Sequence, residues 1–153
     1  MDRRTRVLIL CTGNSARSQM AEGILRHDSS NFFDVESAGV EPSRVRPEAI
    51  QAMSEIGIDI SGQRSKSHDE FDGQKFDYLI TVCDNANERC PVFAGGSKRI
   101  HHNFQDPPPP GVGDEASRLK IFRRVRDEIR EWMADFISKN GSGETTSDRS
   151  TIP

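Results

Sequence analysis

The sequence predicts a single α/β domain in which a four-stranded parallel sheet is flanked by helices. Two observations lead to this fold class. Short apolar segments typical of buried strands alternate along the chain with longer segments of helical periodicity, the pattern of a parallel sheet covered by helices. The chain has 153 residues, enough for one hydrophobic core, and shows no internal repeat. We therefore expect one domain over residues 1–138 and a disordered tail over residues 139–153.

The first strand is expected at residues 6–11, where the continuous apolar run from Val7 to Leu10 is typical of a strand buried on both faces. Three later segments also have strand character. The last of them is less apolar and suits an edge of the sheet. These segments are residues 32–39, 77–82 and 98–104.

Helices are expected between and after these strands. Residues 15–27 place apolar side chains on one face, and Pro47 suits the first turn of a helix over residues 47–56 that ends at Gly57. The longest helix is predicted over residues 114–138, with Asp114 as its N-terminal cap and an apolar stripe along one face. The stripe consists of Leu119, Phe122, Val125, Ile129, Trp132, Met133 and Phe136. Residues 68–75 suggest a short helical turn, and residues 83–90 a loop or short helix.

Composition and charge exclude several classes of protein. The net charge of −3 leaves no basic excess to neutralise phosphates, which argues against non-specific nucleic-acid binding. No apolar run approaches the roughly 18 residues of a membrane span. The N-terminus lacks the apolar core of a signal peptide, so a cytoplasmic protein is expected. Structural disulfides are rare in that compartment, and the three cysteines therefore suggest catalytic or redox chemistry.

Residues 11–18 connect the first strand to the first helix and read Cys-Thr-Gly-Asn-Ser-Ala-Arg-Ser. Backbone N–H groups of a tight loop that enters a helix converge on one point without internal partners, so such a loop binds a tetrahedral oxyanion. The same field favours thiolate over thiol, so Cys11 is expected to be a nucleophile at neutral pH. Arg17 can donate to two anion oxygens, and Ser18 can donate to the Cys11 sulfur.

Each of these residues also has an ordinary structural interpretation. A lone Cys at the end of a buried strand is usually an inert core residue, and a lone Arg near a helix start is usually a surface charge. Their combination as Cys-x5-Arg-Ser between a strand and a helix favours a catalytic site. Gly13 permits a positive φ or a close approach to the anion, and Asn14 tolerates the left-handed region. The expected oxyanion-binding residues are Thr12, Gly13, Asn14, Ser15, Ala16, Arg17 and Ser18.

Cys83 and Cys90 lie seven residues apart and form a second constellation. A metal pair is disfavoured because the spacing is not that of zinc ligands and no second ligand pair is evident. Incidental thiols remain an alternative. On a regular helix the two α-carbons would be about 10 Å apart by rise alone, whereas a disulfide needs about 7 Å or less. A Cys83–Cys90 disulfide would therefore remodel its own segment, as a redox switch does.

The stretch Cys11-Thr-Gly-Asn-Ser-Ala-Arg-Ser-Gln-Met-Ala-Glu-Gly resembles the anion loop of the low-molecular-weight protein tyrosine phosphatase superfamily. The resemblance covers roughly residues 5–137 and implies a flavodoxin-like four-stranded sheet. The pair Cys83 and Cys90, followed by Pro91, is similar to the redox segment of thioredoxin-coupled arsenate reductases, and the phosphatases of the superfamily need no such pair.

The resemblance also implies roles for individual residues. It implies that Cys11 and Arg17 act on arsenate, with phosphate or sulfate as mimics, and that Asp106 in the Asp106-Pro107 pair is the general acid. Asp-Pro alone is a common turn signal. The implied reaction is reduction of arsenate to arsenite through a Cys11–Cys83–Cys90 relay that thioredoxin or a similar dithiol protein recycles. No aromatic residue follows Asp106 as far as Gly113, which favours a small inorganic oxyanion over an aryl ester.

Other functions stay open at this point. A phosphatase could act through a phosphocysteine on Cys11 while the other thiols are idle, and weak phosphatase activity is expected even from a reductase. A reductase could instead be recycled by glutathione and glutaredoxin, or the chain could be a non-catalytic anion-binding protein. We expect no cofactor, no bound metal and no nucleic-acid or membrane partner.

Two departures from the family pattern stand out. Position 16 is Ala where both branches often have a further Cys. Some reductases of the family bind potassium near the anion loop, and Asn14, Glu22 and Ser37 match that site. Lys66 stands where an acidic ligand would be expected, and its ammonium group could replace the cation.

Overall fold

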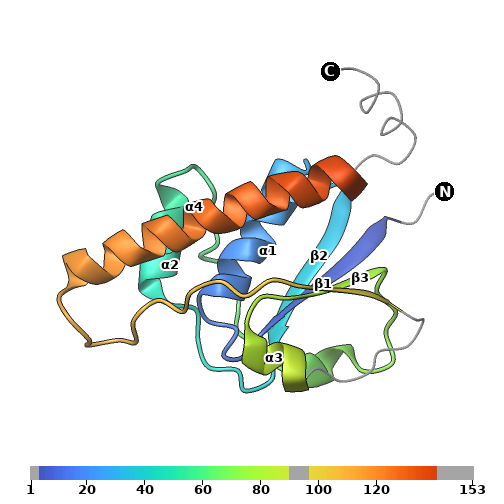
Figure 1. The fold of residues 1–153 in the computed structure, drawn as a ribbon, viewed down its shortest axis with the longest axis horizontal. Coiled ribbons are helices and arrows are strands. Elements are labelled where there is room, and N and C mark those ends of the chain that lie inside the picture. Colours follow the sequence, from blue (N-terminus) through green and yellow to red (C-terminus); the bar gives the residue numbers. More distant parts are fainter. Residues whose placement is uncertain (1–3, 90–96, 141–153) are drawn as a thin grey trace.

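The computed structural model describes residues 4–89 and 97–140. It contains one four-stranded sheet and the helices that pack on it (Figure 1). The strands are β1 (Thr5–Cys11), β2 (Phe33–Gly39), β3 (Tyr78–Thr81) and β4 (Lys98–His101). The helices are α1 (Arg17–Asp28), α2 (Pro47–Ser54), α3 (Asp84–Arg89) and α4 (Glu115–Asn140), with a short 3-10 turn at His68–Phe71.

The sheet is parallel throughout, with strand order β2-β1-β3-β4. The apolar run predicted for β1 lies at its centre: Leu8 is level with Glu36 of β2 on one side and Leu79 of β3 on the other. A strand with neighbours on both edges and helices on its faces must be apolar on both faces, and Val7 to Leu10 are fully buried. The predicted α/β class, parallel sheet and flavodoxin-like order are confirmed.

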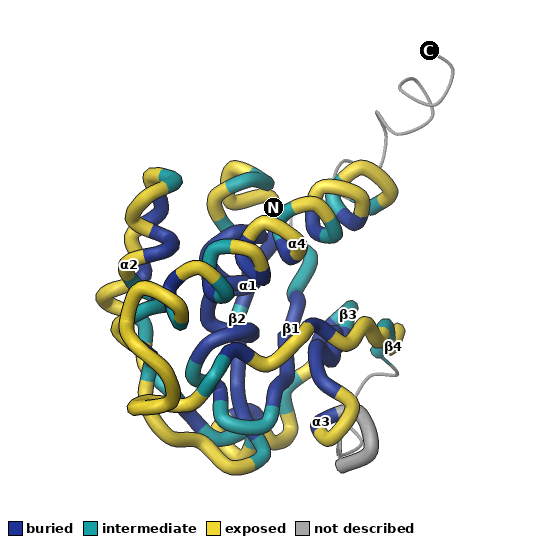
Figure 2. Tube along the Cα trace, turned by 60° about the vertical axis from the view of Figure 1, so that its left-hand side comes forward, coloured by how far each residue is buried: buried dark blue, intermediate teal, exposed yellow. Residues whose placement is uncertain are grey.

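Helices α1, α2 and α4 lie on one side of the strands in Figure 1, and α3 lies on the other side. Burial follows this layering: most of β1 and β2 and the inward sides of the helices are dark in Figure 2, whereas β4 and the outer surfaces of α2 and α4 are exposed. The predicted stripe of α4 faces the core, where Phe122, Val125, Ile129 and Met133 are fully buried. No helix in the described ranges is long and apolar enough to cross a membrane.

Several element boundaries differ from those expected. β4 ends at His101 rather than residue 104, although the Phe104 N–H still donates to the Val82 carbonyl at 3.1 Å. α4 continues to Asn140, two residues beyond the predicted end, and the Tyr78 hydroxyl donates to the Asn140 side chain there at 3.0 Å. Residues 141–153 of the predicted disordered tail lie outside the described residues, so that prediction stays untested.

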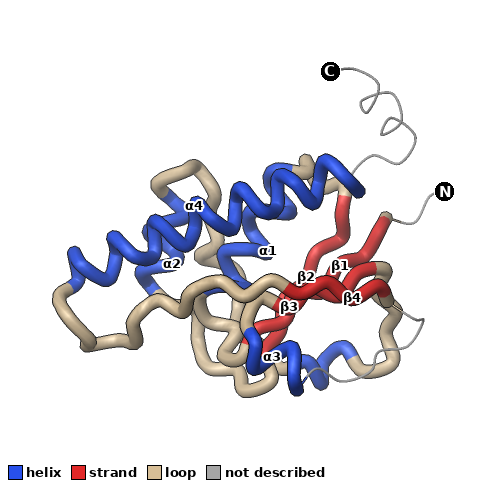
Figure 3. The backbone as a smooth tube through the Cα atoms, viewed as in Figure 1, coloured by secondary structure: helices blue, strands red, loops and turns tan. Residues whose placement is uncertain are grey.

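The carboxyl ends of the four parallel strands meet at one edge of the sheet, where α1 and α3 begin (Figure 3). Cys11 ends β1, Gly39 ends β2 and Cys83 follows β3. In open parallel sheets ligands bind beyond this edge. The fold therefore brings together residues from distant parts of the sequence, as expected for a site at the carboxyl edge.

Candidate active site

The loop between Cys11 and Arg17 runs from the end of β1 into the first turn of α1. The N-cap residue of α1 is Ala16, which has no side chain to cap the helix, and the first turn carries no acidic residue. The first N–H groups of a helix lack internal acceptors and carry partial positive charge. An uncapped helix start at the end of a buried strand is therefore suited to bind an anion.

Asn14 holds the shape of this loop. Its φ is +49°, so the left-handed residue is Asn14 rather than Gly13. The Asn14 amide donates to Ser18 Oγ at 2.8 Å and Ser37 Oγ at 3.0 Å, and its Oδ1 accepts from the Lys66 backbone N–H at 2.9 Å. These three bonds are fully buried or nearly so, and they offset the cost of a left-handed non-glycine residue. Ser18, which belongs to the predicted oxyanion loop, is therefore hydrogen-bonded to Asn14 through its hydroxyl oxygen.

Gly39 at the end of β2 makes the loop's close approach possible. A Cβ at this position would lie 2.7 Å from the Thr12 carbonyl oxygen and 3.0 Å from Asn14. The N–H groups of Val40 and Glu41 donate to the Cys11 and Thr12 carbonyls. These two hydrogen bonds attach the loop to the segment that follows β2. They lie on the side of the loop away from its anion-binding face.

Arg17 reaches from the start of α1 to the segment after β4. Its Nη1 donates to the Phe104 carbonyl at 3.0 Å, and its Nη2 lies 3.4 Å from Asp106 Oδ1. Its Nε is buried and has no acceptor among the described residues. A buried guanidinium N–H without an acceptor is costly, and an oxyanion in the adjacent loop would supply one. The structure thus brings Asp106, with a largely exposed side chain, to the predicted site.

Cys11 and Cys83 are both buried free thiols, and they lie close enough for each to shift the pKa of the other. Thr12 Oγ1 lies 3.2 Å from Cys83 Sγ, and the Ala86 N–H donates to the same sulfur at 3.4 Å. The Asn85 amide donates to Thr12 Oγ1 at 2.8 Å and so orients the hydroxyl. Two of the three predicted redox residues therefore meet at the base of the loop. Cys90 lies outside the described residues.

The pKa values of the two thiols shift in opposite directions. The hydrogen bond from Cys11, with smaller contributions from Thr12 and Ala86, lowers the pKa of Cys83 to about 5. The hydrogen bond to Cys83 and burial raise the pKa of Cys11 well above its ordinary value, although Arg17 opposes them. These shifts favour a thiolate on Cys83 over one on Cys11 in the free protein, and the role of Cys11 as the nucleophile stays a prediction.

Sequence reasoning missed Thr12 as a partner of Cys83, because nothing in the local pattern links residues 71 positions apart. It also missed Arg44 and Arg46, which line a cavity beside the loop together with Ser15 and Asp106. The signal that could have found them is the Arg-x-Arg-Pro sequence in the loop before α2.

The residues compared with a potassium site do come together. Ser37 Oγ donates to Glu22 Oε1 at 2.6 Å and accepts from Asn14. The buried Lys66 ammonium lies 3.9 Å from Glu22 and 3.9 Å from Glu36. The Lys66 ammonium group already supplies a positive charge beside these carboxylates, so this set of residues does not favour a potassium ion.

One other group among the described residues has metal-ligand character. His68, Asp69 and Asp72 bring one possible ligand atom each within 4.8 Å of one another. Both aspartates are exposed, and the group lies on the 3-10 turn rather than in the anion loop. Exposed carboxylates are common without a metal, so the group adds nothing to the chemistry of the loop.

The fold thus brings a cysteine at the end of β1, an arginine at the start of α1 and an aspartate from a later loop around one point. This is the arrangement expected of a cysteine-based oxyanion site. The model of the family described as low molecular weight phosphotyrosine protein phosphatase matches residues 6–143. The chain belongs to this family.

Similar proteins include both branches of the superfamily. An arsenate reductase of Halalkalibacterium halodurans is 44% identical over 130 residues, which cover 85% of this chain and 93% of that protein. The structure of an arsenate reductase in a phosphate-binding state has a TM-score of 0.67 at 34% identity and covers 88% of this chain and 98% of that one. A low molecular weight protein tyrosine phosphatase from T. tengcongensis has a TM-score of 0.69 at 26% identity, covering 88% and 99%.

Proposed function

We propose that this protein is an arsenate reductase, which reduces arsenate to arsenite through Cys11, Cys83 and Cys90. The observation that supports this most strongly is the pair of buried free thiols, Cys11 and Cys83, that lie close enough at the base of the loop to shift the pKa of each other. A phosphatase of the same fold needs one nucleophilic sulfur, whereas a reductase must supply two electrons and hence a second sulfur within reach of the first. The similar arsenate reductases support the same choice.

The first step is attack on arsenic. Arsenate lies in the loop, where its oxygens accept from the loop N–H groups and from Arg17. The Cys11 proton moves to the neighbouring Cys83 sulfur, and the Cys11 thiolate forms a bond to arsenic. The bond from arsenic to one hydroxyl breaks, and Asp106 protonates that oxygen, which leaves as water. The product is a Cys11–arsenate adduct.

The second step transfers the electrons. The Cys83 sulfur attacks the Cys11 sulfur while its proton passes to an oxygen on arsenic. The sulfur–arsenic bond breaks and leaves its electron pair on arsenic, which is reduced from As(V) to As(III). Arsenite departs, and a Cys11–Cys83 disulfide remains.

The third step regenerates the nucleophile. Cys90 attacks Cys83 in the Cys11–Cys83 disulfide, Cys11 is released as a thiol, and a Cys83–Cys90 disulfide forms. A dithiol protein such as thioredoxin then reduces that bond by thiol–disulfide exchange. A chain that cycles through free thiols suits the reducing cytoplasm, where we place it.

A Cys83→Ser variant tests the reductase against the phosphatase. We expect it to lose arsenate reduction and to retain hydrolysis of 4-nitrophenyl phosphate, since that hydrolysis needs only Cys11, Arg17 and Asp106. Cys11→Ser is the matched control and should lose both activities. Arsenate reduction that survives in Cys83→Ser would contradict the proposal.

The second candidate function is a phosphatase that acts through a phosphocysteine on Cys11. The arrangement of Cys11, Arg17 and Asp106 favours it, because phosphate and arsenate have the same shape and charge. Recycling by glutathione and glutaredoxin is the alternative for the reductase. Replacing thioredoxin by glutaredoxin in the same assay separates the two electron donors.

A further inference from the structure

A cavity of about 370 Å³ lies between α4 and the segment that follows β4. Residues 102–104 form one wall, and α4 forms the other with Trp132 and the carboxylates around it. Among the described residues that line this cavity there is none from the oxyanion loop, and neither Arg17 nor Asp106 takes part. The cavity is therefore separate from the site described above.

Aromatic rings line the cavity. The centre of the His102 ring lies 4.6 Å from that of Phe104 and 5.7 Å from that of Trp132, and Phe104 meets Trp132 edge to face at 6.3 Å. Phe136 stacks on Trp132 at 6.0 Å and so holds the indole in place. Trp132 is only partly buried, so part of its surface is left for an occupant.

Three carboxylates surround the indole on α4. Glu128, Glu131 and Asp135 recur at intervals of three and four residues, so they share one side of the helix. Glu128 Oε2 lies 3.9 Å from Arg124 Nε, and both side chains are half exposed. Asp135 Oδ2 lies 3.1 Å from Lys139 Nζ in a second exposed pair. Glu131 makes no ion pair or hydrogen bond within the described ranges.

Carboxylates thus dominate the charge of the cavity. No lysine or arginine from residues 4–89 or 97–140 lines it. The two basic residues that pair with its rim lie further along the helix, and exposed pairs of this kind are weak. The cavity therefore combines aromatic surface with negative charge that has little internal compensation.

The same combination of ring and carboxylate holds an arginine twice elsewhere in the protein. The Arg6 guanidinium lies 4.4 Å over the Phe76 ring while its Nε donates to Asp34 at 3.1 Å. The Arg46 guanidinium lies 5.0 Å over the Phe122 ring and 3.3 Å from a glutamate carboxylate. A guanidinium group is flat, so it stacks on aromatic faces while its N–H fork pairs with carboxylates.

We propose that this cavity binds the guanidinium group of an arginine side chain from a partner protein. Trp132 and Glu131 present a ring and a carboxylate for which the described part of the chain supplies no arginine. Tryptophan attracts a cation more strongly than other aromatic rings, and tryptophan and arginine are enriched among the residues that dominate protein interfaces.

Charge complementarity selects this occupant. An anionic side chain would be repelled by three carboxylates, and a neutral one would gain no charge pairing. The inference goes beyond the proposed function and does not depend on it, since none of these residues takes part in the proposed reaction.

The test is a titration of the reduced, full-length protein with Nα-acetylarginine amide at constant ionic strength. Trp132 is the only tryptophan of the chain, so tryptophan fluorescence reports on this cavity. We expect the fluorescence and the amide signals of residues 102–104 and 131–135 in ¹H–¹⁵N spectra to change along one saturation curve. Nα-acetylcitrulline amide has nearly the same shape without the charge, and it should bind at least about fivefold more weakly.

Glu131→Gln removes the unpaired carboxylate and keeps the size of the side chain. The variant should bind acetylarginine amide at least about threefold more weakly. Glu131 is exposed, so its replacement does not threaten the fold. The matched control is Glu115→Gln, which removes one exposed carboxylate from the first turn of the same helix and should leave the curve unchanged.

Four outcomes would overturn the proposal. Two of them are equal binding of the arginine and citrulline amides, and a Glu131→Gln protein that behaves like the wild type. Equal weakening in Glu115→Gln would reveal general charge attraction instead of a site. Self-association of the wild type in sedimentation velocity that Glu131→Gln abolishes would place a second copy of this chain in the cavity, in place of a different protein.

Discussion

Cys11 and Cys83 lie close enough at the base of the loop for each to shift the pKa of the other. A thiolate is favoured on Cys83 because Cys11, Thr12 and Ala86 all direct donors at its sulfur, while Cys11 is enclosed and has the Cys83 thiolate as its neighbour. The arrangement serves both halves of the proposed reaction. One proton moved from Cys11 to Cys83 turns Cys11 into the nucleophile and leaves Cys83 as the next sulfur to attack.

Removing the Cys11 thiol tests this assignment of the thiolate. In a Cys90→Ser background, absorbance at 240 nm should show one thiolate forming near pH 5, because the pKa of Cys83 is lowered to about 5. Adding Cys11→Ala removes the main donor, so the step should move to higher pH. The sign follows directly, since a lost hydrogen bond to the charged form disfavours that form.

Adding Cys83→Ser to the same background should remove the acid step and leave only the Cys11 thiol. An acid step that survives in Cys83→Ser and disappears in Cys11→Ala would contradict the assignment and place the thiolate on Cys11.

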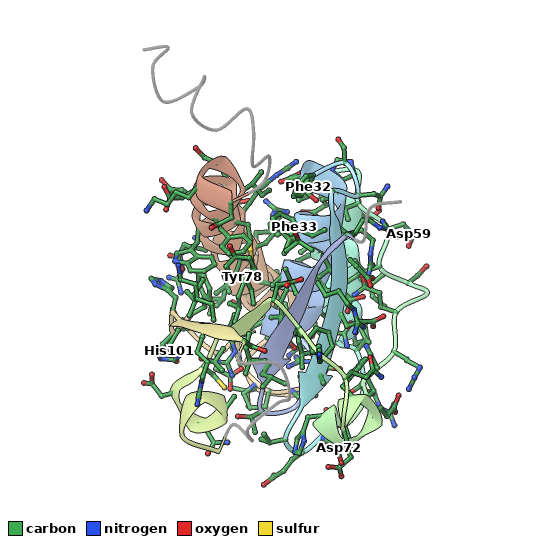
Figure 4. The ribbon with its side chains drawn as sticks, turned by 90° about the vertical axis from the view of Figure 1, so that its right-hand side faces the viewer. Phe32, Phe33, Asp59, Asp72, Tyr78 and His101 are labelled. Atoms are coloured by element: carbon green, nitrogen blue, oxygen red, sulfur yellow. The ribbon has the colours of Figure 1, made fainter. Side chains whose placement is uncertain are left out.

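At the scale of elements, the start of α3 is fastened to the end of β4. His101 Nδ1 lies 2.7 Å from Thr81 Oγ1, and its Nε2 lies 2.7 Å from Asp84 Oδ1. Asn103 Oδ1 accepts from the Asp84 N–H at 3.1 Å. Figure 4 shows His101 at the end of β4, next to α3. These contacts flank Cys83 on both sides in the sequence, so they restrain the position of its sulfur.

His101→Ala should loosen the first turn of α3. The variant loses two hydrogen bonds, one to a carboxylate, and we expect the amides of residues 84–86 to exchange with solvent about fivefold faster, the effect of about 1 kcal/mol. Hydrogen exchange followed by NMR measures this directly. His102→Ala is the matched control, because His102 packs on Phe104 and Trp132 instead. Unchanged rates in His101→Ala would show that the contacts do not restrain α3.

The sequence predicted elements well where apolar periodicity was strong. The apolar run of β1 and the stripe of α4 left few alternatives, and both formed within two residues of the expected bounds. β4 was overextended, because residues 102–104 continue alongside β3 by hydrogen bonds without forming a strand. A local sequence pattern indicates which side chains alternate between the two faces of a strand. It does not show where the hydrogen-bond ladder between two strands ends.

At the scale of the whole molecule, α4 joins the sheet, α1 and α2 into one core. The Arg130 guanidinium on α4 binds Asp28 at the end of α1 through two bonds of 2.8 and 2.9 Å. Burial raises the pKa of Asp28, but hydrogen bonds from Arg130 and His27 lower it more, so the pKa falls below its ordinary value of 3.8. The salt bridge between Asp28 and Arg130 therefore links α1 to α4, two helices that are far apart in the sequence.

Arg130→Gln should lower the free energy of unfolding by about 1 kcal/mol at pH 7, a value limited by the partial exposure of Arg130. The pKa of Asp28 is depressed in the folded state, so the bridge contributes fully above pH 3.8 and its contribution is lost as the pH falls through the folded-state pKa. Urea denaturation at pH 7 and near pH 2.5 measures the difference. Lys120→Gln, an exposed charge on the same helix, is the control; an Arg130→Gln effect that does not shrink in acid would contradict this role.

The candidate site was predictable in part. Because the carboxyl ends of parallel strands share one edge, the sequence placed Cys11, Cys83 and Asp106 together, and Arg17 belonged to a recognisable loop. The charge on Cys83 and the Arg46 cavity were not predictable. Both depend on contacts between segments far apart in the chain, such as Thr12 with Cys83 and Arg46 with Phe122.

The central claim is that three thiols carry electrons to arsenate. The most direct test is arsenate-dependent NADPH consumption with thioredoxin and thioredoxin reductase, measured for the wild type, Cys83→Ser and Cys90→Ser. The relay predicts sustained consumption by the wild type, none by Cys83→Ser, and one arsenite per chain followed by arrest in Cys90→Ser. Sustained turnover of Cys90→Ser, or no arsenate turnover with phosphate ester hydrolysis intact in all three proteins, would contradict it.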